Sequence, residues 1–434
     1  MSGKVVIAFV AGAILLVIQP PLSAERVYQY EVTVGPGQGY NFATINAAIV
    51  NIENNRSAGD LACIWIYPKT AGYEEQLHDT YTFKAPDPPC GDGQVHTFNV
   101  DCHNLPVDCD LRKPSSESGE VRILHYAPPT VGQCEGEGCE NCPYENGITP
   151  DWHIYKYGVI CNGNNLLERL IIENAFGSGY YAQASVNMSA DGEVRDCTVK
   201  NRHGPAVQAG GDLFMSGCTI SSYFGACVVF GNSATTDSTF ATISDCTITP
   251  RWYPPFETPT AIKACGPGRI ERVNVRACSG CPDGYGQIQE WGVFGIVTQL
   301  QNSEHVEIAD CDIDLDLTTQ YVARKTAALR VCGILSGRFW NVEQGGGDFP
   351  GKAVVRDCTI DVTGIEEDGP GENDGADIMV DGVCVRGGGT VEVYGCSSIT
   401  TSWTPAGSTG EGYEYLLNEE NGTLGASFAV SAWE

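Results

Sequence analysis

The stretch Val194-Arg-Asp-Cys-Thr-Val199 decides the fold of this chain, because close copies of it recur through the second half of the sequence. Further copies with a cysteine in the same slot are Met215–Ile220, Ile243–Ile248, Ile308–Ile313, Val355–Ile360 and a shortened one that ends at Cys396. Two copies carry another apolar residue in the slot, Leu167–Ile172 and Ile270–Val275. Repetition at this scale indicates a stacked, nearly one-dimensional architecture.

The spacing inside each copy indicates β-structure. The shared slot falls at positions 170, 197, 218, 246, 273, 311, 358 and 396. Apolar residues stand three positions before the slot, in it and two positions after it. The slot and the residue two positions after it are spaced as side chains on one face of a strand. The three-residue step that leads to the slot breaks this alternation, as a bend between two short strands would. With many β-branched residues, 52 Gly and 23 Pro, a helical repeat is disfavoured.

Short strands with one bend per copy resemble the right-handed parallel β-helix of the pectin lyase-like superfamily, over about residues 32–401. Val32–Ile49 looks like the strand, glycine turn and capping helix that open such proteins, and Ile64–Pro68 with Gly72–Glu75 is similar to the first coil of pectin methylesterases. The resemblance implies an all-β right-handed parallel β-helix, a solenoid with an N-terminal capping helix. It leaves the function open, because the superfamily includes lyases, hydrolases, esterases and non-enzymatic surface proteins.

The chain divides into five expected segments. Residues 1–24 are predicted to be a secretory signal peptide, since Lys4 precedes an apolar run and Leu22-Ser-Ala24 offers a small-residue cleavage site. Residues 25–88 are expected to form the N-terminal cap and first coil, 89–150 a Cys-rich loop insertion, 151–403 the parallel β-helix, and 404–434 a C-terminal coil or cap. We therefore expect a secreted or cell-surface protein without stable membrane insertion after signal cleavage.

The composition is strongly acidic, with a net charge of −29. Nucleic acid is excluded as a partner by this balance, because phosphates require a basic face. The acidity suits solubility outside the cell, and calcium binding is the sharper interpretation. An anionic polysaccharide would be repelled unless a cation or a local basic cluster compensates.

The 20 cysteines fall into groups. Those in the repeat slot are expected to face inward, about 4.8 Å apart in neighbouring coils, as reduced and small hydrophobic residues. Disulfides between coils are the alternative in an exported protein. A second inward set is expected at Cys161, Cys265, Cys332 and Cys384. Disulfides, with a zinc site as the alternative, are expected for the insertion, at Cys90, Cys102, Cys109, Cys134, Cys139 and Cys142.

Basic and aromatic residues follow the repeat strands and are predicted to line one outer face, as a sugar-binding groove requires. The substrate-binding candidates are Lys200, Tyr223, Trp252 and Tyr253, and the catalytic candidates are Arg202, His203, Arg251 and Arg276. Aromatic rings stack on sugar rings, and guanidinium groups pair with carboxylates through two hydrogen bonds. Ordinary solvated loop residues are the alternative interpretation.

Four aspartates alternate with apolar residues and are expected to point outward together, namely Asp310, Asp312, Asp314 and Asp316. Carboxylates on one strand face repel one another unless a cation or a basic neighbour compensates. A calcium ion is the expected cofactor at this position, since its ligands are oxygen atoms.

The catalytic patterns of the superfamily are largely missing. The Gln-Asp-Thr segment of pectin methylesterases and the Asn-Thr-Asp and Asp-Asp pairs of polygalacturonases are not found. Similarity to pectate lyases implies a chemistry in which calcium acidifies the proton beside a uronate carboxylate and an arginine removes it. One hypothesis is therefore an exported carbohydrate-directed protein, such as a calcium-assisted lyase on acidic polysaccharide or a glycoside hydrolase. The alternative is a non-catalytic surface or matrix protein with a glycan- or cation-binding face.

Overall fold

The computed structural model describes residues 26–75, 77, 81–85, 96–100, 103–125, 158–174, 184–201, 204–222, 225–231, 239–250, 259–278, 292–300, 304–318, 329–337, 351–365, 378–395, 397–404, 412–420 and 423–428. The expected signal peptide lies outside these residues, as do Cys90, Cys102, Cys134, Cys139 and Cys142. In the described part of the chain, no helix has the length and apolar character that a membrane crossing requires.

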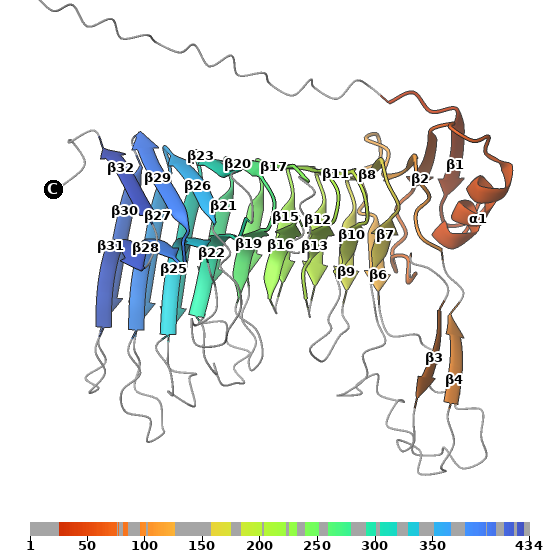
Figure 1. Cartoon of the computed structure of the whole chain (residues 1–434). Coiled ribbons are helices and arrows are strands. Elements are labelled where there is room, and N and C mark those ends of the chain that lie inside the picture. The colour runs from red at the N-terminus through yellow and green to blue at the C-terminus, as the bar shows by residue number, and fades with distance from the viewer. Residues whose placement is uncertain are drawn as a thin grey trace, which may run out of the picture.

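The described strands stack into a rod of successive coils, with one helix at its N-terminal end (Figure 1). Sheet A holds twelve strands. They are β1 (Tyr30–Val34), β2 (Ala62–Ile66), β5 (Cys109–Arg112), β8 (Asn165–Glu168), β11 (Gly192–Arg195), β14 (Leu213–Ser216), β17 (Ala241–Ser244), β20 (Gly268–Glu271), β23 (Val306–Ala309), β26 (Lys352–Arg356), β29 (Thr390–Gly395) and β32 (Thr423–Phe428).

Sheet B and sheet C hold nine strands each. Sheet B contains β6 (Arg122–His125), β9 (Ile171–Asn174), β12 (Thr198–Asn201), β15 (Thr219–Ser222), β18 (Thr247–Pro250), β21 (Asn274–Cys278), β24 (Asp312–Thr318), β27 (Thr359–Ile365) and β30 (Ser398–Thr404). Sheet C contains β7 (Val159–Cys161), β10 (Val186–Met188), β13 (Val207–Ala209), β16 (Ala226–Phe230), β19 (Thr260–Ala264), β22 (Gly292–Thr298), β25 (Leu329–Gly337), β28 (Ile378–Arg386) and β31 (Gly412–Glu420).

Each complete coil contributes one strand to each sheet, and equivalent strands of neighbouring coils pair in parallel. The repeat sets the register, since Val194 pairs with Leu167 on one side and with Met215 on the other. The expected all-β right-handed parallel β-helix is thus confirmed.

The bend inside each repeat copy lies between sheet A and sheet B. The residue before the slot has a positive φ, for example 50° at Asp196 and 64° at Gly217. Asp and Gly tolerate this left-handed conformation better than most residues. The slot thiols then donate to the carbonyl two residues earlier, at 3.2 Å from Cys197 Sγ to Arg195 O and from Cys218 Sγ to Ser216 O. Cysteine therefore combines a small buried volume with a donor at the bend.

The five described slot cysteines lie in the main core as free thiols, in agreement with the sequence analysis, namely Cys197, Cys218, Cys246, Cys311 and Cys358. Cys396 lies outside the described residues. The second expected set is partly wrong. Cys161 belongs to the main core, and Cys265 is only partly buried. Cys332 and Cys384 belong to a separate buried cluster with Phe294, Val297 and Leu335. The strands β25 and β28 alternate their side chains, so residues next to the core positions point to the other face of sheet C.

The N-terminal end of the rod is closed by α1 (Ile45–Asn55), which confirms the expected capping helix. The helix begins after Thr44, whose hydroxyl accepts a hydrogen bond from the backbone of Ala47. The Glu75 carboxylate accepts further hydrogen bonds from the backbone N–H groups of Ile45 and Asn46, at 2.8 and 2.9 Å. Burial raises the pKa of Glu75 although these hydrogen bonds oppose the shift.

The expected Cys-rich insertion at 89–150 is corrected in its middle part. Residues Cys109–Arg112 and Arg122–His125 form β5 and β6, which are regular members of sheets A and B. Cys109 is a buried free thiol of the main core and forms no disulfide. The sequence does not predict this coil because the coil lacks the repeat phrase. Its one signal is that Cys109 and Leu111 alternate as inward-facing residues of a strand do. The strands β3 (Tyr81–Ala85) and β4 (His96–Val100) pair with each other in an antiparallel hairpin.

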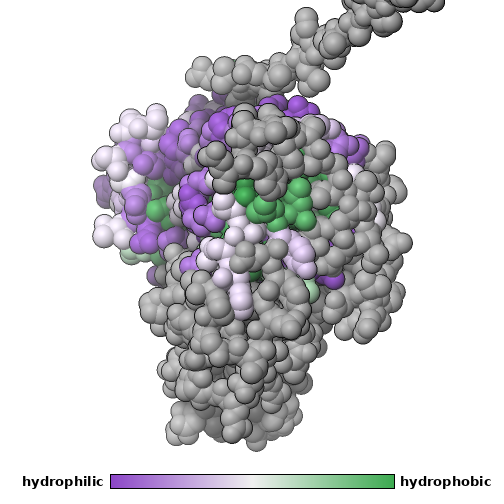
Figure 2. All heavy atoms as spheres, turned by 90° about the vertical axis from the view of Figure 1, so that its left-hand side faces the viewer, coloured by the Kyte–Doolittle hydropathy of each residue, from purple (hydrophilic) through white to green (hydrophobic). Residues whose placement is uncertain are grey.

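The C-terminal end is formed by β30, β31 and β32 of the last coil. Viewed along the rod from this end, hydrophobic residues gather near the middle, and hydrophilic residues lie mainly to their left and above them (Figure 2). Ile399, Trp403 and Leu417 pack against the main core and are only partly buried. The two ends thus differ, since helix α1 buries its Ile45, Ile49 and Ile52 completely.

Candidate functional site

The predicted outer face is the outward-facing side of sheet B, which we call face B. Alternation puts every second residue of its strands outside the core. One outward row runs across the coils as Lys200, Ser221 and Thr249, then Arg276, Asp314 and Asp361. The strands β18 and β21 pair just before it, through Thr247–Asn274 and Ile248–Val275, which aligns Thr249 with Arg276. The structure therefore brings Lys200 and Arg276 onto one face, as predicted, although 76 positions separate them in the sequence.

The part of this row between Lys200 and Arg276 has a cation at each end, and Lys200 on β12 is the first of them. Its Nζ lies 2.8 Å from Glu173 Oε1, and half of the Lys200 side chain remains exposed, at 49%. Burial alone would raise the pKa of Glu173, but the hydrogen bond and charge of Lys200, with Arg122, lower that pKa overall. The Lys200 side chain is thus positioned by Glu173 and is still accessible to solvent.

Hydroxyl side chains form the floor between the two charged ends. Thr219 and Ser221 on β15, with Thr247 and Thr249 on β18, face outward and are exposed or half-buried. Three inter-strand steps of about 4.8 Å separate Lys200 from Arg276, which is a distance of about 14 Å. A flat floor of hydroxyl groups between two cations can donate and accept hydrogen bonds along an extended polar ligand.

Arg276 on β21 forms the second charged end. Its Nη1 lies 2.7 Å from Asp314 Oδ2, and its Nη2 lies 2.6 Å from Asp312 Oδ2. All three side chains are between 42% and 49% exposed. Because Arg276 bridges both carboxylates, its guanidinium is held in a fixed position on face B.

The four predicted calcium ligands do not share one face. Asp312, Asp314 and Asp316 lie on β24, whereas Asp310 lies at the bend, with a φ of 52°. Among the residues that the structure describes, no group of three or more His, Cys, Asp or Glu side chains is arranged to hold a metal ion. Calcium binding stays a prediction of the sequence, and no chemical step is derived from it.

Six of the predicted site residues lie outside the described part of the chain: Arg202, His203, Tyr223, Arg251, Trp252 and Tyr253. In the sequence they follow β12, β15 and β18 directly, which are the strands that form the floor. Their roles remain predictions.

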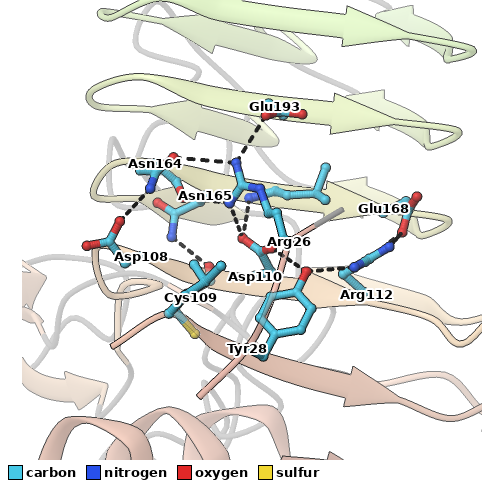
Figure 3. Close-up of polar contacts among 12 residues, drawn as sticks. Arg26, Tyr28, Asp108, Cys109, Asp110, Arg112, Asn164, Asn165, Glu168 and Glu193 are labelled. Atoms are coloured by element: carbon cyan, nitrogen blue, oxygen red, sulfur yellow. Dashed lines mark hydrogen bonds and ion pairs between the residues drawn. The ribbon is translucent and has the colours of Figure 1, made fainter. Parts of the chain in front are cut away.

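A second polar cluster, which the sequence pattern does not predict, lies on the outer side of sheet A. We call it the Asp110 cluster, and it consists of Arg26, Tyr28, Asp110, Arg112 and Glu168 (Figure 3). Asp110 Oδ1 accepts hydrogen bonds from Arg26 Nη1 at 2.8 Å and from the Leu166 backbone at 2.9 Å. Asp110 Oδ2 accepts one from the Tyr28 hydroxyl at 2.7 Å. The Asp110 side chain is fully buried.

Arg112 closes the Asp110 cluster on its other side. Its guanidinium donates to the Tyr28 hydroxyl at 2.6 Å and to Glu168 Oε2 at 2.6 Å. It also lies over the rings of Tyr28 and Trp65, at 5.7 and 5.0 Å from their centroids. Burial is the main cause that raises the pKa of Tyr28, and the hydrogen bond to Asp110 adds to it.

Burial also raises the pKa of Asp110, although Tyr28, Arg26 and the Leu166 backbone act in the opposite direction. A perturbed carboxyl of this kind is a common mark of a functional site. Here, however, Arg26 and Tyr28 of the chain's own N-terminal segment occupy its oxygens. Arg26 reaches Glu193 on β11 as well, at 3.1 Å (Figure 3). We therefore interpret the Asp110 cluster as a fastening of that segment across several coils.

The chain matches no family model and no curated protein. It is similar to two solved structures. One is the crystal structure of Escherichia coli YbhC, with a TM-score of 0.40 and 12% identity, covering 79% of this chain and 74% of that one. The other is the pectin methylesterase from Aspergillus niger in deglycosylated form, with a TM-score of 0.34 and 13% identity, covering 94% of this chain and 93% of that one. At this similarity, the function has to be argued from the residues of the chain itself.

Proposed function

We propose that this protein is an exported, carbohydrate-directed β-helix that binds a glycan chain along face B. The observation that carries the proposal is the hydroxyl floor between two exposed cations, Lys200 and Arg276. An extended polysaccharide offers many hydroxyl groups in a row, and a floor of serine and threonine side chains can pair with them. The rigid register of the coils fixes the spacing of these groups before a ligand arrives, which lowers the entropy cost of binding.

The geometry favours the non-catalytic alternative over a lyase. A lyase base must take a proton from the substrate, and both outer nitrogens of Arg276 already donate to aspartates. Arginine also stays protonated under ordinary conditions. Arg276 is therefore suited to hold a ligand by charge and hydrogen bonds. A lyase reaction through Arg251 or His203 remains the second candidate, on the sequence alone.

The test is binding of the full mature chain to immobilised neutral and acidic polysaccharides, by affinity electrophoresis. Lys200→Ala and Arg276→Ala are expected to weaken the binding of at least one glycan several-fold. Lys263→Ala is the matched control, since it removes one cation from β19 on sheet C and is expected to leave binding unchanged. Equal binding by all three variants would contradict the assignment to face B.

Lyase activity is tested by incubating the protein with the same polysaccharides in solution. The ultraviolet absorbance of unsaturated uronate is followed over time. Binding without an absorbance increase excludes a lyase reaction on the glycans tested. An increase that Arg251→Ala or His203→Ala abolishes would instead establish the lyase.

A further inference from the structure

The row of aspartates on β24 has a cation already in place. Asp312 and Asp314 stand two positions apart on one strand face, and each presents one oxygen to a different nitrogen of Arg276. Like charges that face outward side by side destabilise a strand unless something neutralises them. Arg276 supplies that positive charge from β21, where it is the direct register partner of Asp314.

No other described group competes for this role on the neighbouring strands. On β18 the outward residues are Thr247 and Thr249, which carry no charge. On β27, the strand that follows β24, they are Thr359, Asp361 and Thr363, so the only charge there is negative. Arg276 is thus the only positive charge among the described residues of these four strands.

The arrangement is poorly suited to a calcium ion. Calcium binds six to eight oxygen ligands at about 2.3–2.6 Å, and it needs carboxylate oxygens that are free to converge on it. The guanidinium occupies the space between the two carboxylates and would repel a divalent cation at that position. Asp310, the expected fourth ligand, lies at the bend instead of on β24.

We propose that Arg276 is the resident counter-cation of the β24 aspartates and takes the place that the sequence pattern suggests for calcium. Face B then keeps its charged end in position without a metal ion. The proposal does not depend on glycan binding, because it concerns only the protein and a cation.

A specific consequence follows for the removal of Arg276. Without the guanidinium, the exposed carboxylates of Asp312 and Asp314 have no cationic partner among the described residues, and Asp316 is next on the same strand. This variant should gain affinity for a divalent cation, although the substitution adds no ligand. A gain of metal binding on loss of an arginine is an effect that an ordinary surface ion pair on this rod should not produce.

The experiment measures calcium binding to the full mature chain by isothermal titration, with terbium luminescence as the second readout. The wild-type protein is expected to show no saturable site that involves β24. Arg276→Ala is expected to bind calcium at least tenfold more tightly than the wild type. Calcium should also raise the midpoint of thermal unfolding of this variant, because a ligand stabilises the state that binds it. Asp312→Asn with Asp314→Asn in the Arg276→Ala background should abolish both effects.

Arg356→Ala is the matched control, since Arg356 is 46% exposed and pairs with one carboxylate, Glu307, at 3.7 Å. It is expected to gain no calcium site. If Arg276→Ala does not fold, Arg276→Gln removes the charge and keeps most of the side chain. The proposal is overturned if folded Arg276 variants bind calcium no better than the wild type. It is equally overturned if the wild type binds calcium at a site that Asp312→Asn and Asp314→Asn remove.

Discussion

The Asp110 cluster and the Arg276 pair contain the same chemistry in two different environments. In both, an arginine from one segment binds an aspartate on a neighbouring strand, at 2.8 Å for Arg26–Asp110 and 2.7 Å for Arg276–Asp314. The Asp110 side chain is fully buried and that of Arg26 is 15% exposed, whereas Asp314 and Arg276 are 49% and 42% exposed. Burial therefore separates a pair that holds the fold together from one that can meet a ligand.

The physical reason is the solvent. Water screens an exposed ion pair, so such a pair adds little stability. A buried carboxylate has lost its water and depends on each partner that replaces it. The comparison thus predicts large effects on stability at Asp110, small ones at Arg276, and the reverse for ligand binding.

The largest effect is expected for Asp110→Ala. The substitution removes one of the acceptors of the Arg26 guanidinium and the acceptor of the Tyr28 hydroxyl, so the free energy of unfolding should fall by about 3–5 kcal/mol. Urea unfolding followed by circular dichroism measures this loss. A decrease below about 1 kcal/mol would mean that the Asp110 cluster does not fasten the N-terminal segment.

Tyr28→Phe is expected to have an intermediate effect. It removes one hydrogen bond to Asp110 and one from Arg112, while the ring and its contact with Trp65 remain. The expected loss is about 2 kcal/mol, since hydrogen bonds to charged groups are among the stronger ones. The same urea titration measures it. A loss close to zero would show that the ring, and not the hydroxyl, carries the contact.

Arg276→Ala should change the stability by less than about 1 kcal/mol in calcium-free buffer, because all three side chains of its pair are exposed. Its effect should appear in glycan binding instead, as a several-fold weaker affinity. Unfolding and binding are measured on the same preparation. A large loss of stability would mean that Arg276 holds the fold together as Arg26 does, and would contradict its role as an accessible ligand-binding group on face B.

The smallest effect is a pH dependence at the Lys200 end of face B. The folded pKa of Glu173 is lowered by Lys200 and Arg122, so the pair stabilises the fold above the unfolded pKa of about 4.3 and loses this contribution as the pH falls through the folded pKa. With solvent screening, the contribution is about 0.5 kcal/mol or less.

The difference in unfolding free energy between the wild type and Glu173→Gln should therefore shrink between about pH 5 and pH 3. The ionisation of Asp110 should affect stability with the opposite pH dependence, because burial raises the folded pKa of Asp110 where ion pairing lowers that of Glu173. A difference at Glu173 that grows with acid would contradict the assignment of the pair.

The fold was predictable from the sequence because it repeats. The slot of Cys197 and Cys218 needs a buried apolar residue after a left-handed bend, and this local requirement recurs in coil after coil, where Leu170 and Val273 also meet it. The coil of β5 and β6 was not recognised because its strands follow a different phrase. Cys109 and Leu111 occupy alternate positions of β5, as inward-facing strand residues do. Two such residues between long stretches without a repeat copy are too few to predict a coil.

The site was predictable only in part. Lys200 and Arg276 were expected on one face, since each follows a repeat strand, and the register confirms it. The Asp110 cluster could not be expected, because Arg26 and Asp110 are 84 residues apart and belong to no repeat. The pairing of Arg276 with Asp312 and Asp314 was also not predicted, although both strands were.

By itself, the sequence determined the coil, its bend and its inward-facing cysteines, since these follow from alternation and from a conformation that few residues accept. Only the tertiary structure decided which charges meet. A partner one coil away lies about 4.8 Å off in space but dozens of positions away in the chain. Because the loops inserted between the copies vary in length, the sequence alone does not tell which charged residues of neighbouring coils lie side by side. The same three-dimensional packing decided that Asp110 is buried and that Asp314 is open to solvent.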